Sequence, residues 1–228
     1  MPADQRSGDD AAFRAAVAEL EAAVADQREL RPEVSFDGEP PPRRLAPHAA
    51  AVGATVVVAE TEIGWGRFVL LYDPVGQEGW EGPFRVIAYL RAALDPEIAA
   101  DPLIGQVGWS WLTEALDARA AGYAAPSGTV TRVVSEGFGA KQGEPVATGF
   151  EMRASWSPIP RADEDAAGAP DSAGSPGIER YCLDRHVAAW ADALSTAAGL
   201  PPLAPGVAQL RPARPARPSH QAHPRRRP

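Results

Sequence analysis

The chain has 228 residues, which is enough for one domain with appended segments. Its apolar fraction of 45% is typical of a folded protein, and no apolar run approaches the roughly 20 residues that span a bilayer. One cysteine, Cys182, excludes an internal disulfide and any site built from several cysteines. The N-terminus is acidic and polar, unlike a secretory signal, so we expect a cytoplasmic protein without a membrane partner.

Charge is unevenly distributed along the chain. The last 28 residues hold six arginines and no acidic residue. Residues 1–200 therefore carry 16 basic and 30 acidic side chains, a formal charge of −14. The folded part should repel nucleic acid, and only the tail could attract it.

The first half of the chain predicts a helix, a connector and three strands. Apolar side chains at helical spacing predict a helix over about 10–26. The proline-rich stretch at 31–48 is typical of a stiff connector or a sheet edge. Apolar and β-branched runs then predict three strands, at 54–60, 64–73 and 84–92. The third strand places its even-numbered apolar residues, from Phe84 to Leu90, on one face.

The second half alternates helical and strand periods. These periods predict helices at 95–100, 109–122 and 178–198, and a pair of strands at 127–139 and 146–156. Ser110 is the expected N-cap of the middle helix. Residues 157–177 have almost no large apolar side chains, which predicts a disordered loop.

Together the elements predict an α+β fold. We expect a five-stranded, mostly antiparallel sheet with flanking helices, in the order α-β-β-β-α-β-β-α. The single domain should cover residues 10–200. Residues 1–9 and the proline- and arginine-rich tail at 201–228 are expected to be disordered.

Long stretches of the sequence resemble a known family. The segments GRFVLLYDPVGQEGWEGPFR, ADPLIGQVGWSWLTEALDA and SGTVTRVVSEGFG are similar, in register, to the actinobacterial family 3000 of domains of unknown function. The likeness extends from about Leu30 to Pro202. It implies no activity, because the family has none assigned.

The chain carries no recognisable catalytic signature. Its single lysine, Lys141, nearly excludes phosphate-binding loops and most Schiff-base chemistry. Only His48 and His186 lie outside the tail, and His186 is expected at a surface or a helix end. We therefore expect no metal and no other cofactor, and we lean towards a protein that is not an enzyme.

What remains is a group of tryptophans with polar neighbours in two segments, DPVGQEGW and GWSWLTE. Aromatic anchors beside polar groups are typical of ligand pockets and of interface hot spots. The alternative is that these tryptophans fix a long turn to the sheet. The candidate surface consists of Asp73, Gln77, Trp80, Trp109, Trp111 and Glu114.

Three hypotheses for function follow. The leading one is a non-catalytic binding or adaptor domain that uses this surface, with a protein partner or self-association. The alternative is an enzyme or small-molecule binder with a carboxylate site drawn from Asp73, Glu78, Glu114 or Glu136. The second alternative is weak nucleic-acid association through the basic tail.

Overall fold

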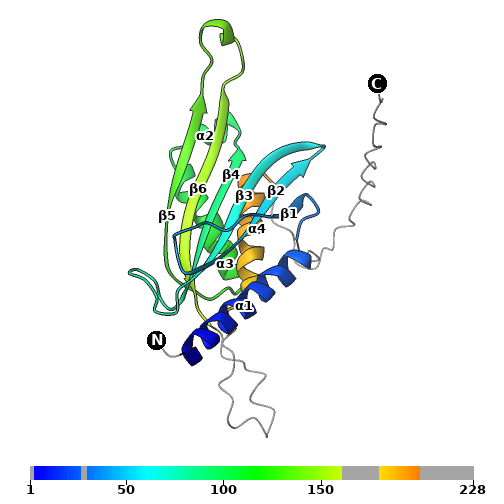
Figure 1. Ribbon diagram of the computed structural model, residues 1–228. Coiled ribbons are helices and arrows are strands. Elements are labelled where there is room, and N and C mark those ends of the chain that lie inside the picture. The colour runs from blue at the N-terminus through cyan, green and yellow to red at the C-terminus, as the bar shows by residue number, and fades with distance from the viewer. Residues whose placement is uncertain (1–2, 27–29, 161–179, 201–228) are drawn as a thin grey trace, which may run out of the picture.

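The computed structural model describes residues 3–26, 30–160 and 180–200. Within these ranges, six strands form one antiparallel sheet in the order β1-β2-β3-β4-β6-β5 (Figure 1). The strands are β1 (Val34–Gly38), β2 (His48–Val58), β3 (Thr61–Tyr72), β4 (Phe84–Ala93), β5 (Tyr123–Ser135) and β6 (Ala147–Pro158). The helices are α1 (Ala3–Ala25), α2 (Pro96–Ala100), α3 (Ile104–Ala118) and α4 (Leu183–Ala197), with a 3-10 turn η1 (Gly139–Lys141).

The fold class is as predicted: α+β, with an antiparallel sheet and flanking helices. The sheet has six strands and not five, because part of the proline-rich connector is the edge strand β1. In β1, Val34 and Phe36 turn inward, and Val34 pairs with Val56 of β2. No described helix is long and apolar enough to cross a membrane.

Several predicted boundaries were wrong. Ser110 is not an N-cap: it lies inside α3, where its hydroxyl donates to the carbonyl of Val107. The last helix begins at Leu183 and not at 178, because Cys182 adopts a left-handed conformation with φ of 50°. Ser157 and Pro158 belong to β6 and not to a loop. Residues 161–177 of that predicted loop, and the tail at 201–228, lie outside the described residues.

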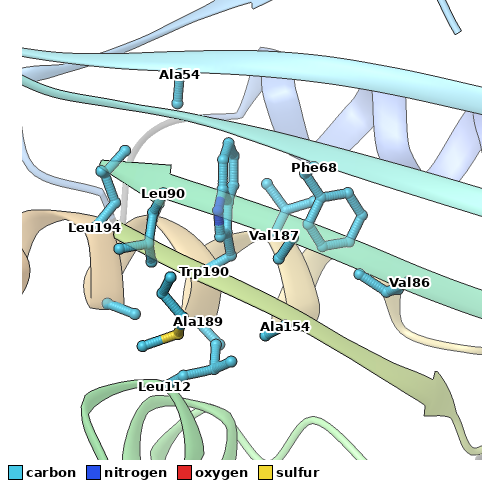
Figure 2. Packing of buried hydrophobic residues seen from close by; sticks show 14 of the residues in the cluster. Ala54, Phe68, Val86, Leu90, Leu112, Ala154, Val187, Ala189, Trp190 and Leu194 are labelled. Carbon is cyan, nitrogen blue, oxygen red and sulfur yellow. The ribbon is translucent and has the colours of Figure 1, made fainter. Parts of the chain in front are cut away.

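The core lies between one face of the sheet, called here the helix face, and the helices behind it. Alternate residues of β3, β4 and β6 point to this face, including Phe68, Val86 and Ala154 (Figure 2). Helix α4 supplies Trp190, which is fully buried against Phe68 at a ring separation of 5.7 Å. Helices α1 and α3 flank α4, so α4 is the centre of the helical layer.

The opposite face of the sheet, the open face, is crossed by the segment 39–47, called here the strap (Figure 1). The Glu39 side chain lies over Gly53 of β2. Arg67 of β3 donates a hydrogen bond to the carbonyl of Pro40. Gln77 donates to the carbonyl of Leu45 over 3.1 Å. These contacts tie the strap to β2, to β3 and to the loop that follows β3.

The ends of α3 and α4 make the same backbone turn with different residues. After α3, the Ala120 and Ala121 amides donate to the carbonyls of Asp117 and Leu116. The turn gives Ala120 a φ of 49°, whereas Gly199 takes the equivalent place after α4 with a φ of 80°. Because a left-handed conformation strains an alanine, we expect Ala120→Gly to raise the free energy of unfolding by about 1 kcal/mol. Gly199→Ala should lower the free energy of unfolding. Urea unfolding measures both variants, and changes of the same sign would contradict the explanation by left-handed strain.

Candidate functional site

The side chains of the open face form rows across the strands. One row runs from Leu71 on β3 to Arg85 on β4. In the next, Ile87 of β4 pairs with Ser155 of β6, which pairs with Ser127 of β5. These rows lie at the end of the sheet where β3 passes into β4 through the loop 73–83.

That loop is held against the open face by hydrogen bonds to its backbone. The hydroxyl of Ser157, which is fully buried, accepts from the Glu81 amide over 2.9 Å. Asp73 starts the loop with an Asx-type contact, its carboxylate accepting from the Val75 amide over 3.1 Å. The Trp80 amide donates to the carbonyl of Gln77 over 3.0 Å, which closes the turn. Trp80 is thereby placed above the rows of the sheet.

Arg85 is a buried cation without an anionic partner. Its residue is only 7% exposed. One guanidinium nitrogen donates to Ser155 over 2.8 Å and to Ser127 over 3.3 Å. The other donates to Ser157 over 3.3 Å and to the carbonyl of Gly79 over 3.4 Å. Among the described residues no carboxylate lies within ion-pair distance of Arg85, and burial lowers the pKa of Arg85 below its ordinary value.

A shallow pocket of about 600 Å³, called here the Arg85 pocket, opens above this cation. Its floor comes from β3, β4, β6 and β5, one wall from the 73–83 loop, and Leu45 of the strap closes another side. The lining combines apolar and hydroxyl-bearing side chains: Leu45, Leu71, Trp80, Ile87, Ser127, Thr129 and Ser155. Glu78 is the only acidic side chain among the lining residues. Such a volume lies within the usual range for small-molecule sites.

Beyond the pocket, the open face carries an aromatic and cationic row. Trp65 packs on Tyr89 at a ring separation of 4.9 Å. The guanidinium of Arg153, which also lines the pocket, lies 5.5 Å from the centre of the Tyr89 ring. Glu151 lies 3.8 Å from both Arg153 and Arg91, so these two exposed arginines share one carboxylate. Arg85 therefore differs from Arg153 and Arg91 in having no acidic partner among the described residues.

The structure separates the predicted candidate surface into two groups. Asp73, Gln77 and Trp80 lie together in the β3–β4 loop, where the Gln77 amide donates to the Asp73 carboxylate over 3.1 Å. Trp109 and Trp111 lie on α3, on the helix face, and both pack against the core. Of the first group, Gln77 and Trp80 line the Arg85 pocket.

The two tryptophans of α3 contact neighbouring strands. Trp111 meets Phe150 of β6 at a ring separation of 5.3 Å. The Trp109 ring lies beside Gly128, where an added Cβ would approach it to 2.6 Å. Glu114 is exposed on the same helix. None of these three residues lines the Arg85 pocket.

The carboxylates proposed for a catalytic site lie on separate elements. Asp73 and Glu78 belong to the β3–β4 loop, Glu114 to α3, and Glu136 follows β5 at its far end. Among the described residues no group of three or more histidine, cysteine, aspartate or glutamate side chains could hold a metal. His186 is buried and not at a surface, and its Nδ1 accepts a hydrogen bond from the indole of Trp156 over 3.1 Å.

The central residue of the site, Arg85, was not among the sequence candidates. The sequence does indicate on which face of the sheet Arg85 lies. In FRVIAYLRA the apolar face contains Phe84 and Val86, so the alternation places Arg85 on the opposite face. The same argument applies to Ser155 on β6. The sequence pattern does not show that loop 73–83 folds back over these positions and buries the arginine.

Comparison with known proteins agrees with the resemblance noted in the sequence. The model of a family described as "Protein of unknown function (DUF3000)" matches residues 9–208, which is most of the chain. No curated protein and no solved structure gave a match.

Proposed function

We propose that this chain, which belongs to the DUF3000 family of proteins of unknown function, is a non-catalytic binding domain for a small anionic ligand. The ligand would lie in the Arg85 pocket with its negative group at the guanidinium. Trp80, one of the tryptophans that suggested a binding surface, forms part of the wall.

The observation that carries this proposal is the unpaired, buried Arg85. A cation removed from water loses hydration free energy, and hydrogen bonds to neutral hydroxyls restore only part of it. An anion that entered the pocket would supply the missing charge and could accept hydrogen bonds from the guanidinium. The hydroxyls of Ser127 and Ser155 lie 3.1 Å apart and could then turn to donate to the same ligand.

The pocket lining favours binding over catalysis. Its lining residues include no histidine and no cysteine, and Glu78 is their only carboxylate. General acid–base and nucleophilic mechanisms usually need two such groups within hydrogen-bond reach of each other. Arginine and serine hydroxyls without a neighbouring base are suited to holding a charge in place.

The proposal can be tested with arginine variants from the same strand. Arg85→Met removes the buried cation, whereas Arg91→Met removes an exposed arginine of β4 outside the pocket lining. Thermal unfolding and calorimetric titration would use acetate, benzoate and inorganic phosphate as probes. We expect at least one anion to stabilise the wild type and the Arg91 variant, and Arg85→Met to weaken its binding about 10- to 100-fold.

Two outcomes would contradict the proposal. One is an anion-dependent shift that survives in Arg85→Met. The other is a wild type that no probe stabilises.

A second variant places an anion in the pocket without removing the arginine. Ser127 is exposed on the edge strand β5, and its hydroxyl lies 3.3 Å from the Arg85 guanidinium. Ser127→Asp should form an ion pair with Arg85, raise the free energy of unfolding by about 1 kcal/mol and block the added anion. Ser127→Asn has nearly the same shape without the charge. Equal stability and equal anion binding in the two variants would show that Arg85 does not need an anion.

A further inference from the structure

We infer that the ligand of the Arg85 pocket is a monocarboxylate with an apolar body. This inference rests on the function proposed above and specifies its ligand class. It follows from two features of the pocket, the number of unpaired charges and the chemistry of the walls.

The charges around the pocket suit a single negative charge. Arg85 is the one lining cation without a carboxylate neighbour among the described residues, since Arg153 already contacts Glu151. Glu78 adds a negative charge to the lining, and this would repel a dianion more strongly than a monoanion. Phosphate sites usually combine several cations or a row of backbone amides. In the Arg85 pocket, by contrast, the only guanidinium without a carboxylate neighbour among the lining residues is that of Arg85, and hydroxyls lie beside it.

The walls suit an apolar body attached to that charge. Leu71 and Ile87 flank Arg85 on the floor, Trp80 rises from the loop, and Leu45 of the strap faces them. Leu45 is 47% exposed, so an apolar ligand group would cover surface that water now contacts. A volume of about 600 Å³ also exceeds what a bare carboxylate or phosphate ion needs. The ligand should therefore bury several carbon atoms beside its charged group.

The direction of the body follows from the position of the charge. The 73–83 loop closes the pocket at one end, where Gly79 and Ser157 bind the guanidinium. A carboxylate at Arg85 would leave its carbon chain to run over Ile87, between Trp80 and the strap. This path leads towards the open part of the sheet, where Tyr89 follows Ile87 on the same face.

The test is a titration of the full chain with linear carboxylates of increasing length, from acetate to octanoate. Each buried methylene should tighten binding roughly three- to fourfold. Octanol, which lacks the charge, and octyl phosphate, which carries a larger one, should each bind at least about 10-fold more weakly than octanoate. Ile87→Ser should flatten the dependence on chain length. The matched control Val134→Ser removes an exposed valine of β5 outside the pocket lining and should leave it unchanged.

The possible results separate this inference from the proposed function. Octyl phosphate or inorganic phosphate binding more tightly than octanoate, with loss in Arg85→Met, would overturn the ligand class and keep the anion site. Affinity that does not change from acetate to octanoate would overturn the apolar body. Octanol binding as tightly as octanoate would show apolar adsorption without a role for the charge. If no anion of either kind binds, the proposed function fails as well.

Discussion

Replacing Trp190 with alanine is expected to lower the free energy of unfolding by about 4 kcal/mol, because it removes a large and fully buried aromatic side chain from the centre of the core. Trp190 projects from α4 towards the sheet and lies among Phe68, Leu90 and Val187 (Figure 2). Its indole also donates to the carbonyl of Tyr89 over 3.3 Å. The substitution therefore removes packing and leaves one backbone acceptor without that donor.

The sheet is shaped around this indole, so the cavity cannot easily close. Gly66 of β3 lies against the ring, and a Cβ at that position would approach it to 2.8 Å. An added Cβ would also come within 2.7 Å of the Tyr89 carbonyl, so the strand backbone already lies close to its neighbour. Because strands β3 and β4 are fixed by their mutual hydrogen bonds, neighbouring groups can fill little of the space.

Trp65 provides the matched control for this prediction. It is the same residue type on the same strand as Gly66, but it lies on the open face and is 39% exposed. Trp65→Ala should cost about 1 kcal/mol, since much of its surface remains in water in the folded state. Urea unfolding at neutral pH measures both values. If Trp65→Ala lowered the free energy of unfolding as much as Trp190→Ala does, the burial of Trp190 would not be the reason for its large effect.

The sequence predicted the helix face of the sheet better than the open face. Alternation in β4 and β6 identified which residues point to the core, because a period of two has only one arrangement once the apolar side is buried. The same pattern left β1 uncounted, because the proline-rich stretch that contains Val34–Gly38 fitted a connector as well as a sheet edge, and five residues give a weak signal.

The Arg85 pocket depends on contacts between distant segments, which local patterns do not encode. Arg85 meets Ser127 and Ser155, which are 42 and 70 residues away in the sequence. Leu45 of the strap lines the same pocket, and Gln77, 32 residues away in the sequence, donates a hydrogen bond to its carbonyl. Trp80 stood out in the sequence as a tryptophan with polar neighbours, but the sequence did not show that its loop folds onto the sheet and makes it a wall of the pocket.

His186 shows how a burial missed by the sequence leads to a pH dependence. The ring is fully buried on α4, and burial lowers its pKa to about 4, although a hydrogen bond with the Tyr181 backbone opposes this shift. In the unfolded chain the pKa of a histidine is about 6.5. The unfolded state therefore binds a proton as the pH falls through 6.5, while the folded state stays neutral until about pH 4.

Stability should consequently fall as the pH is lowered through this window. Between pH 7.5 and 4.5 the His186 contribution lowers the free energy of unfolding by about 2.5 kcal/mol, from the pKa difference between the two states. His186→Asn should remove this loss, because the amide does not titrate and its oxygen can still accept from Trp156, which now donates to His186 over 3.1 Å.

The measurement is urea unfolding of the wild type and His186→Asn at several pH values between 7.5 and 4.5. Carboxylates titrate at the low end in both proteins, so the difference between the two curves isolates the histidine. At pH 7.5 the variant will be less stable if asparagine fills the site less well, but this offset does not depend on pH. The curves should converge or cross as the pH falls. If the two curves of unfolding free energy against pH ran parallel, His186 would bind a proton as readily in the folded protein as in the unfolded chain. Its burial would then not lower its pKa.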